Sequence, residues 1–313
     1  MVKDDYTYRQ WKSKPDGAQR KSIRNPQSAI RNPQSKNPQS AIRNPMSRLF
    51  AIAIWLTAIV TVGLFAWPRW RAPESISAHS AAIDHQFKIT LIVIGAGFAI
   101  THGALGYAVW RYRAKNGERA SHSSGNARVE IILAAITASV FIALAITGQR
   151  VWAGLRLNQT APDAVRVEAV AQQFVWNFRY PGADGKFGRV DPKLYNDADN
   201  SIGARPGPLG VDPADPSGND DIVTTTLVAP VNRPISLTLR SKDVIHDFYV
   251  PALRLKQDAV PGMRINIHFI ATREGRYEIA CAELCGQFHH QMRAYLDVKS
   301  PRDYEEWLKK NGK

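Results

Sequence analysis

Three long apolar segments constrain this chain more than any other feature. Residues 49–67, 89–110 and 131–148 carry no formally charged side chain. About 20 apolar residues are enough for a helix to cross the hydrocarbon core of a bilayer. The first segment could instead be a signal peptide, but no good small-x-small cleavage site follows it, which favours an uncleaved helix. The sequence therefore predicts two or three transmembrane helices within residues 46–150.

The net charge is concentrated around these segments. The formal charge of +14 divides into +8 for residues 1–48, +5 for 49–150 and +1 for 151–313. A nearly neutral C-terminal half argues against binding the phosphate backbone of a nucleic acid, so no nucleic-acid partner is expected. Four basic residues follow the second span, namely Arg111, Arg113, Lys115 and Arg119. Because basic loops stay in the cytoplasm, the third span is expected to return the chain to the periplasmic side of the plasma (inner) membrane.

The N-terminal tail has a repetitive polar sequence. The run Arg-Asn-Pro-Gln-Ser at residues 24–28 recurs at 31–35, in part at 36–40, and again from residue 43. Such a segment cannot bury a hydrophobic core, so residues 1–45 are predicted to be a disordered low-complexity tail. Met46 directly precedes the first apolar segment, which raises the hypothesis that the translation start is mis-assigned.

Two ionisable side chains lie within or beside the spans. His102 is inside the second span, where a histidine that packs between helices is the ordinary expectation. Glu130 opens the third span, where a carboxylate is commonly an interfacial anchor. The residues by themselves do not decide whether Glu130 has a further role.

Residues 151–313 have the pattern of a β-domain. Aromatic side chains occupy alternate positions from Phe174 to Tyr180, as expected for a strand with one buried face. Short strand-like segments lie at 165–171, 173–180, 222–228, 235–240, 244–250, 263–270, 276–280 and 293–299. Residues 184–221 form a long insertion rich in Gly, Pro and Asp. Ser300 and Pro301 open a final short helix. Many short strands separated by turns predict a sandwich.

The only two cysteines, Cys281 and Cys285, stand beside a histidine and a methionine. His289 follows four residues after the second cysteine and Met292 three residues later. Two cysteines could form a disulfide in an oxidising compartment, but thiolate, imidazole and thioether together are soft ligands that select copper. A loop with these residues between two late strands is how a cupredoxin-type sandwich holds copper. The predicted fold is therefore a membrane-anchored all-β protein, with N-terminal transmembrane helices followed by a cupredoxin-like β-sandwich.

A second histidine is needed from a distant strand, and His246 is the best candidate. Together the motifs resemble subunit II of the haem-copper cytochrome c oxidases. The family pattern Cys-x-Glu-x-Cys-Gly-x-x-His-x-x-Met is matched at every fixed position from Cys281 to Met292, and the upstream Asp-Val-x-His ends at His246. The motif Lys-x-Asp-Ala-x-Pro-Gly also matches, at residues 256–262. The resemblance extends from about residue 84 to the C-terminus.

The resemblance implies a dinuclear copper centre, CuA, in residues 151–313. Two bridging thiolates would be completed by two imidazoles and two weaker ligands, so that the set is His246, Cys281, Glu283 through its carbonyl, Cys285, His289 and Met292. The Glu283 side chain would help to hold magnesium or manganese at the boundary with subunit I, in a network that includes Asp258. Taken singly, Met292 could be a core residue and His246 a buried structural histidine. His290 lies outside the family register, and His268 belongs to no motif.

Two further roles follow from the resemblance. Glu130 would stand at the cytoplasmic mouth of a proton pathway into subunit I. Phe174 and Trp176 would lie where the electron enters, although the family usually has tryptophan at the first of these positions. The substitution leaves the role of Phe174 and the identity of the donor open. No Cys-x-x-Cys-His motif occurs, so haem is expected only in the partner subunit.

The function implied is that of an electron-accepting subunit of a terminal cytochrome c oxidase. It would take electrons from cytochrome c and pass them to haem in subunit I, while the assembled complex, with its other subunits, reduces oxygen to water and pumps protons. A nitrous oxide reductase-like CuA protein is the alternative. It is disfavoured by Glu283, where that family has tryptophan, and by the spans. A membrane-bound copper chaperone would give no reason for Glu283, His289 and Met292 to lie in register.

Overall fold

The computed structural model describes residues 46–67, 72–113, 125–156, 161–196 and 209–312. The predicted disordered tail, residues 1–45, lies outside this range, as does part of the insertion, residues 197–208.

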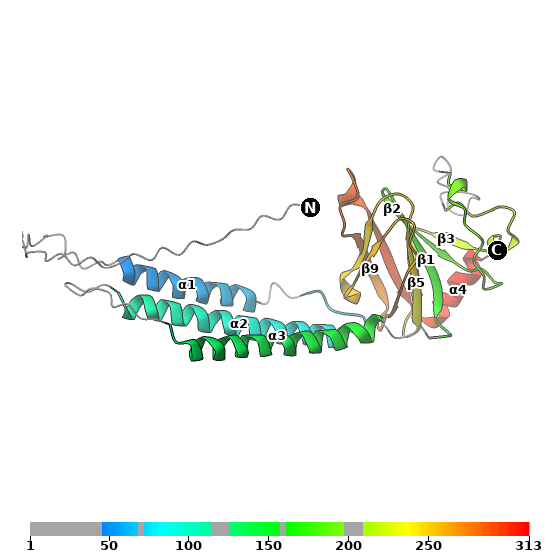
Figure 1. Ribbon diagram of the computed structural model, residues 1–313. Coiled ribbons are helices and arrows are strands. Elements are labelled where there is room, and N and C mark those ends of the chain that lie inside the picture. Colours follow the sequence, from blue (N-terminus) through cyan, green and yellow to red (C-terminus); the bar gives the residue numbers. More distant parts are fainter. Residues whose placement is uncertain (1–45, 68–71, 114–124, 157–160, 197–208, 313) are drawn as a thin grey trace, which may run out of the picture. The chain divides into compact units, whose positions relative to one another are not determined.

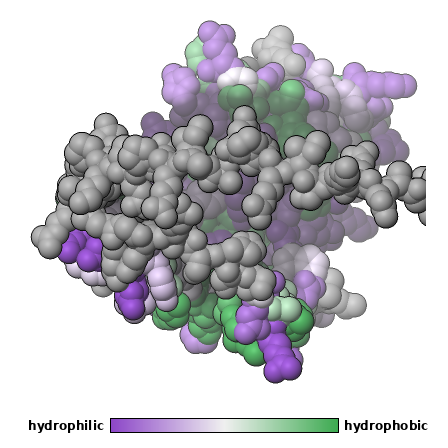
Figure 2. All heavy atoms as spheres, turned by 60° about the vertical axis from the view of Figure 1, so that its left-hand side comes forward, coloured by the Kyte–Doolittle hydropathy of each residue, from purple (hydrophilic) through white to green (hydrophobic). Residues whose placement is uncertain are grey.

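The described part of the chain begins with three long helices, α1 (Met46–Ala66), α2 (Ser80–Arg111) and α3 (Ala127–Arg156) (Figure 1). All three are long and apolar enough to cross a membrane. Large apolar side chains such as Phe65, Ile92 and Phe141 are exposed along them, and hydrophobic surface is visible in Figure 2. Exposed apolar surface of this extent is stable against lipid. The predicted membrane anchor is confirmed.

The first two helices pack closely through small residues. Trp55 of α1 donates a hydrogen bond from its indole nitrogen to the Gly103 carbonyl of α2 (3.3 Å), and its ring lies near that of Trp110. A Cβ atom at Gly106 would lie 2.2 Å from the Trp55 indole nitrogen. Gly106 therefore leaves the space into which the indole fits.

The C-terminal half is a sandwich of two five-stranded sheets. The strands are β1 (Val165–Gln172), β2 (Val175–Tyr180), β3 (Ile222–Thr224), β4 (Thr226–Pro230), β5 (Pro234–Ser241), β6 (His246–Val250), β7 (Leu255–Ala259), β8 (Ile265–Ile270), β9 (Gly275–Cys281) and β10 (Arg293–Lys299). The first sheet has the order β3-β2-β1-β5-β8 and the second β4-β10-β9-β6-β7. Alternate residues such as Trp176, Phe178 and Phe248 fill the space between the sheets. The cupredoxin-like sandwich that the sequence predicts is confirmed.

Two strand predictions differ from the structure. The predicted strand at residues 222–228 is two strands in different sheets, β3 and β4, because the chain bends at Thr225 and crosses from one layer to the other. Strand β7 was not predicted, since its residues are mostly polar and it lies at the edge of its sheet. The final helix, α4 (Pro301–Asn311), begins as expected, with the Ser300 side chain accepting from the Asp303 N–H.

The insertion between β2 and β3 packs on the outer face of the first sheet. Val170, which points away from the main core, contacts Leu209 and Val211 of the insertion. The buried Arg179 guanidinium pairs with Glu168 of β1 and with Asp221 at the end of the insertion. Two short 3-10 turns, η4 (Pro192–Leu194) and η5 (Pro216–Gly218), are capped by aspartates. These contacts attach the described part of the insertion to the sheet.

The segment before α2 is joined to the sandwich by backbone hydrogen bonds. Ile76 is fully buried in the core, and its N–H donates to the Ala252 carbonyl (2.8 Å). The Ile76 carbonyl in turn accepts from the Thr272 N–H (2.7 Å). The start of α2 is therefore held against the β-domain.

Candidate metal centre

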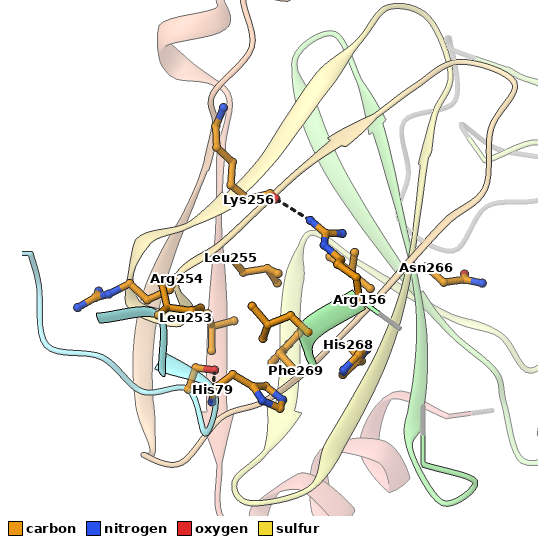
Figure 3. A pocket seen from close by; sticks show the side chains of 13 residues that line it. His79, Arg156, Leu253, Arg254, Leu255, Lys256, Asn266, His268 and Phe269 are labelled. Atoms are coloured by element: carbon orange, nitrogen blue, oxygen red, sulfur yellow. Dashed lines mark hydrogen bonds between the residues drawn. The ribbon is translucent and has the colours of Figure 1, made fainter. Parts of the chain in front are cut away.

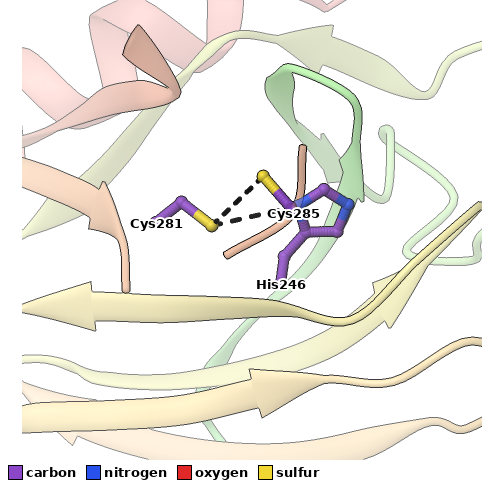
Figure 4. Close-up of side chains that lie close together, drawn as sticks. All are labelled: His246, Cys281 and Cys285. Atoms are coloured by element: carbon purple, nitrogen blue, oxygen red, sulfur yellow. Dashed lines mark hydrogen bonds between the residues drawn. The ribbon is translucent and has the colours of Figure 1, made fainter. Parts of the chain in front are cut away.

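The strand arrangement brings the predicted ligands together from two distant segments. His246 is the first residue of β6 and Cys281 the last of β9, and these strands pair with Phe248 opposite Cys281. The chain then forms the loop 282–292, in which η7 (His289–Gln291) directly precedes Met292 and β10. Figure 4 shows His246, Cys281 and Cys285 converging on one point. Neighbouring strands therefore place both ends of the ligand set.

The donor atoms lie at distances suitable for shared metal coordination. The two Sγ atoms are 3.8 Å apart, and the cysteines are free thiols. Cys281 Sγ is 3.9 Å from His246 Nδ1 and 3.2 Å from the Glu283 carbonyl oxygen. Cys285 Sγ is 3.7 Å from His289 Nδ1 and 3.7 Å from Met292 Sδ. All six predicted donors thus lie in one chain of close contacts.

These spacings fit a metal site. Metal–sulfur bonds of about 2.3 Å and metal–nitrogen bonds of about 2.0 Å, meeting at a tetrahedral angle, separate two ligand atoms by roughly 3.5–3.8 Å. The observed separations are 3.7–3.9 Å for sulfur–sulfur and sulfur–nitrogen pairs. His246 lies on the Cys281 side and His289 with Met292 on the Cys285 side. The set therefore suits two metal ions that share both sulfurs.

The charge of the thiol pair also fits a cation. Burial raises the pKa of Cys281, but hydrogen bonds from the His246 ring and from the backbone outweigh it and lower that pKa to about 6. Burial and the neighbouring Cys281 sulfur raise the pKa of Cys285 to about 11. One thiolate is favoured and a second is opposed by the first. Both sulfurs become thiolates only when a cation offsets the added charge.

Asp243 orients the imidazole of His246. Its Oδ1 atom lies 2.8 Å from His246 Nε2, which leaves Nδ1 facing Cys281. Burial lowers the pKa of His246, but Cys281 and Asp243 outweigh it, and the net pKa is raised. A carboxylate on the outer nitrogen of a ligand histidine fixes its tautomer. The sequence reasoning assigned Asp243 no role of its own, although its place in Asp-Val-x-His offered the signal.

The aromatic residues predicted for electron uptake differ in accessibility. Phe174 is half-buried, and its ring packs edge-on against that of Phe288 (5.5 Å between centroids). Trp176 is fully buried, with its ring 6.1 Å from that of His246. Because the sandwich covers the Trp176 indole, Phe174 is the member of the pair that a protein donor could touch, and the electron-entry role of both residues stays a prediction. Gln173, next to Phe174, donates from its side-chain amide to the Cys285 carbonyl, which joins this strand end to the ligand loop.

The remaining predicted residues lie at the edge of this centre. The Glu283 side chain is exposed, so it is free for a second role while its carbonyl faces Cys281. Asp258 is exposed and lies opposite the buried Asp247, which pairs with Lys256 (2.8 Å). Glu130 is exposed in the first turn of α3.

The other three histidines named in the sequence analysis stay outside the ligand set. His102 Nδ1 lies 2.9 Å from the Phe98 carbonyl within α2, and packing of His102 between helices stays a prediction. His290 is exposed and lies beside Gln291. His268 packs edge-on against His79.

Comparison with known proteins finds one family. The family model described as cytochrome c oxidase subunit II, periplasmic domain, matches residues 217–298. An alternative cytochrome c oxidase subunit 2 of Bradyrhizobium diazoefficiens is 36% identical over 263 residues, covering 82% of this chain and 90% of the relative. A cytochrome c oxidase subunit 2 of Thermostichus vulcanus is 32% identical over 284 residues, covering 83% and 85%.

Among solved structures, the periplasmic domain of subunit II of cytochrome oxidase from Bradyrhizobium japonicum is similar. The match has 26% identity and a TM-score of 0.35, and it covers 49% of this chain and 96% of that chain.

Proposed function

The chain belongs to the cytochrome c oxidase subunit II family, and we propose that it accepts electrons from cytochrome c at a dinuclear CuA centre and passes them to haem in subunit I. Proteins of this family are components of an oxidoreductase, the haem-copper terminal oxidase. The chain carries an N-terminal membrane anchor and a domain of the subunit II periplasmic type. We place it in the plasma membrane, with residues 46–150 as the membrane region and 151–313 on the periplasmic side.

The observation that carries this proposal is that four further donor atoms lie within 3.9 Å of one or other of the two cysteine sulfurs. Two thiolates, two imidazoles and a thioether favour copper over harder ions. When bound, two copper ions bridged by sulfur can share one electron with little change in geometry. The chain's part is to hold the ligands still and to exclude water. His246, Cys281, Cys285 and Met292 are all buried, and Asp243 fixes the His246 ring.

Electron uptake is proposed at the surface around Phe174. Its ring contacts Phe288, which is 46% exposed, and Leu284 in the ligand loop is 78% exposed. Leu284 and Phe288 lie one and three residues from Cys285 in the sequence, so a donor that touches them comes close to the metal site. Apolar contacts centred on few exposed side chains suit a transient partner.

Two roles that involve subunit I complete the proposal. The exposed Glu283 carboxylate would supply one oxygen ligand to magnesium or manganese at the subunit boundary. Glu130 would accept protons at the cytoplasmic end of α3, at the mouth of a pathway into subunit I. Both carboxylates are exposed in this chain, as a role completed by a partner requires.

Copper content and spectroscopy of the purified full-length chain test the central proposal. We expect two copper ions per chain and, at half reduction, an electron paramagnetic resonance signal of one unpaired electron shared by two copper nuclei. Cys285→Ser should abolish that shared signal, whereas His290→Gln, on the exposed neighbouring histidine, should preserve it. One copper per chain, or an unchanged signal in Cys285→Ser, would refute the dinuclear assignment.

A further inference from the structure

A pocket lies where the start of α2 and the end of α3 meet the β-domain, on the side of strands β7 and β8. Figure 3 shows its side chains. It is lined by Ser77, His79, Ile83, Leu155, Arg156, Leu253, Arg254, Leu255, Lys256, Asn266, Ile267, His268 and Phe269. Two contacts join the helices to the strands there. Arg254 pairs with Asp84 of α2 (2.8 Å), and Arg156 donates to the Lys256 carbonyl (3.4 Å).

The lengths of the helices place this pocket near the membrane surface. With a rise of about 1.5 Å per residue, α2 and α3 are roughly 48 and 45 Å long. A bilayer with its headgroups is about 40–45 Å thick. His79 immediately precedes α2 and Arg156 is the last residue of α3. Both residues therefore lie at the level of the lipid headgroups on the side of the β-domain.

The pocket is rich in cationic and donor groups. None of its thirteen lining residues is acidic. Arg254 is neutralised by Asp84, and Lys256 by Asp247. Arg156 is exposed and has no carboxylate partner within the described ranges. Its guanidinium therefore remains as a positive charge at the mouth of the pocket.

Two imidazoles complete the polar part. The rings of His79 and His268 lie edge to face, with centroids 5.8 Å apart, and neither ring has a hydrogen-bond partner among the residues that the structure describes. Burial, followed by the positive groups His79 and Arg156, lowers the pKa of His268. The support for an anion comes from the positive charge of Arg156 beside the two rings, whose nitrogens can donate to it.

Apolar side chains from both the helices and the β-domain also line the pocket. Ile83 of α2 and Leu155 of α3 lie beside the polar groups. A ligand that suits both parts carries a negatively charged head and a hydrocarbon tail. Guanidinium groups recognise phosphate oxygens well, and basic pockets at the ends of transmembrane helices are suited to anionic lipid headgroups.

We propose that this pocket binds the phosphate of an anionic phospholipid, with Arg156, His79 and His268 around the headgroup and the acyl chains along α2 and α3. The bound lipid would join the ends of both helices to the β-domain. This inference does not depend on copper or on electron transfer.

The test uses the full-length chain in detergent, with native mass spectrometry to count retained lipids. Phosphatidylglycerol and phosphatidylcholine are offered at equal concentration, and inorganic phosphate is added in a separate series. We expect preferential retention of one phosphatidylglycerol per chain. Arg156→Gln should weaken this retention by about tenfold or more, the effect of losing one charge-assisted hydrogen bond.

The matched control is Arg150→Gln, which removes the same charge from an exposed position on the same helix, outside the pocket lining. Circular dichroism and thermal unfolding establish that both variants are folded. If a variant were unfolded, His268→Gln would replace Arg156→Gln with the same expectation. Equal retention of both lipids, or equal losses in the two arginine variants, would overturn the proposal. Displacement of phosphatidylglycerol by millimolar inorganic phosphate would overturn the lipid assignment in favour of a soluble anion.

Discussion

Replacing Asp243 by asparagine tests how far the ligand set depends on its surroundings. The carboxylate accepts three hydrogen bonds, from His246 Nε2 (2.8 Å), the Gln173 N–H (2.7 Å) and the Val244 N–H (2.7 Å). Asparagine keeps one oxygen acceptor, and its NH₂ group would face one of these donors. The loss of one charge-assisted hydrogen bond corresponds to about 1.5–3 kcal/mol. Because the Asp243 side chain is 30% exposed, we expect the lower part of this range.

The expected result is copper binding weaker by roughly tenfold, the lower end of the effect of removing such a partner. Copper affinity is measured by competition with a chelator on the purified full-length chain. The control is Asp163→Asn, which removes one negative charge from an exposed position before β1. If both variants bind copper as tightly as the unmodified chain, Asp243 does not orient His246 and the argument from the hydrogen bond is wrong.

Three other substitutions probe separate parts of the molecule. In the assembled oxidase, Glu283→Gln should preserve two copper ions per chain and lower bound magnesium or manganese in elemental analysis, whereas copper loss would show that the side chain supports copper. Gly106→Ala places a Cβ atom 2.2 Å from the Trp55 indole nitrogen and should destabilise the α1–α2 pair by about 1–3 kcal/mol, measured as a lower unfolding temperature in detergent. The control is Gly97→Ala, because a Cβ atom there has no atom within 4 Å. Equal effects of the two substitutions would contradict the packing argument. Burial raises the pKa of Asp221 to about 6, above an unfolded value of about 3.9. The folded state therefore favours the protonated Asp221 carboxyl, and the stability that this preference contributes is fully present below about pH 4 and is lost as pH rises through 6. Asp221→Asn should reduce the fall in unfolding free energy between pH 4 and 7, measured by denaturant titration, and an unchanged slope would exclude Asp221 as its source.

The sequence could predict the ligands because most of them are local. Cys281 to Met292 span one loop, and their types and spacing already indicate copper. His246 required either the resemblance or the structure, since only the pairing of β6 with β9 brings it to Cys281. The supporting role of Asp243 depends on which ring nitrogen faces the metal, and spacing alone does not determine a ring orientation.

The main elements of the fold could also be predicted from the sequence. Apolar length identified the membrane helices, and alternation identified the strands with a buried face. Strand β7 could not be identified in this way because its middle residue, Gln257, is polar, so that three polar residues stand in a row at a sheet edge. The burial of Trp176 could not be inferred from its sequence position, since Gln173, three residues earlier in the turn before β2, is exposed. Periodicity identifies an amphipathic strand, but the packing of the second sheet decides which aromatic is reached by solvent.

The ligand positions are supported by backbone bonds that do not involve a metal. Cys281 donates its N–H to the Met292 carbonyl (3.1 Å), and Met292 donates to the His289 carbonyl (3.1 Å). His289 in turn donates to Gly286, whose φ of 137° favours glycine at that turn. Sheet pairing places His246, and this series of turns places the other side chains. A site held in this way loses little conformational entropy when it binds a metal. The raised pKa of Cys285 opposes a second thiolate, and a bound cation would offset that opposition.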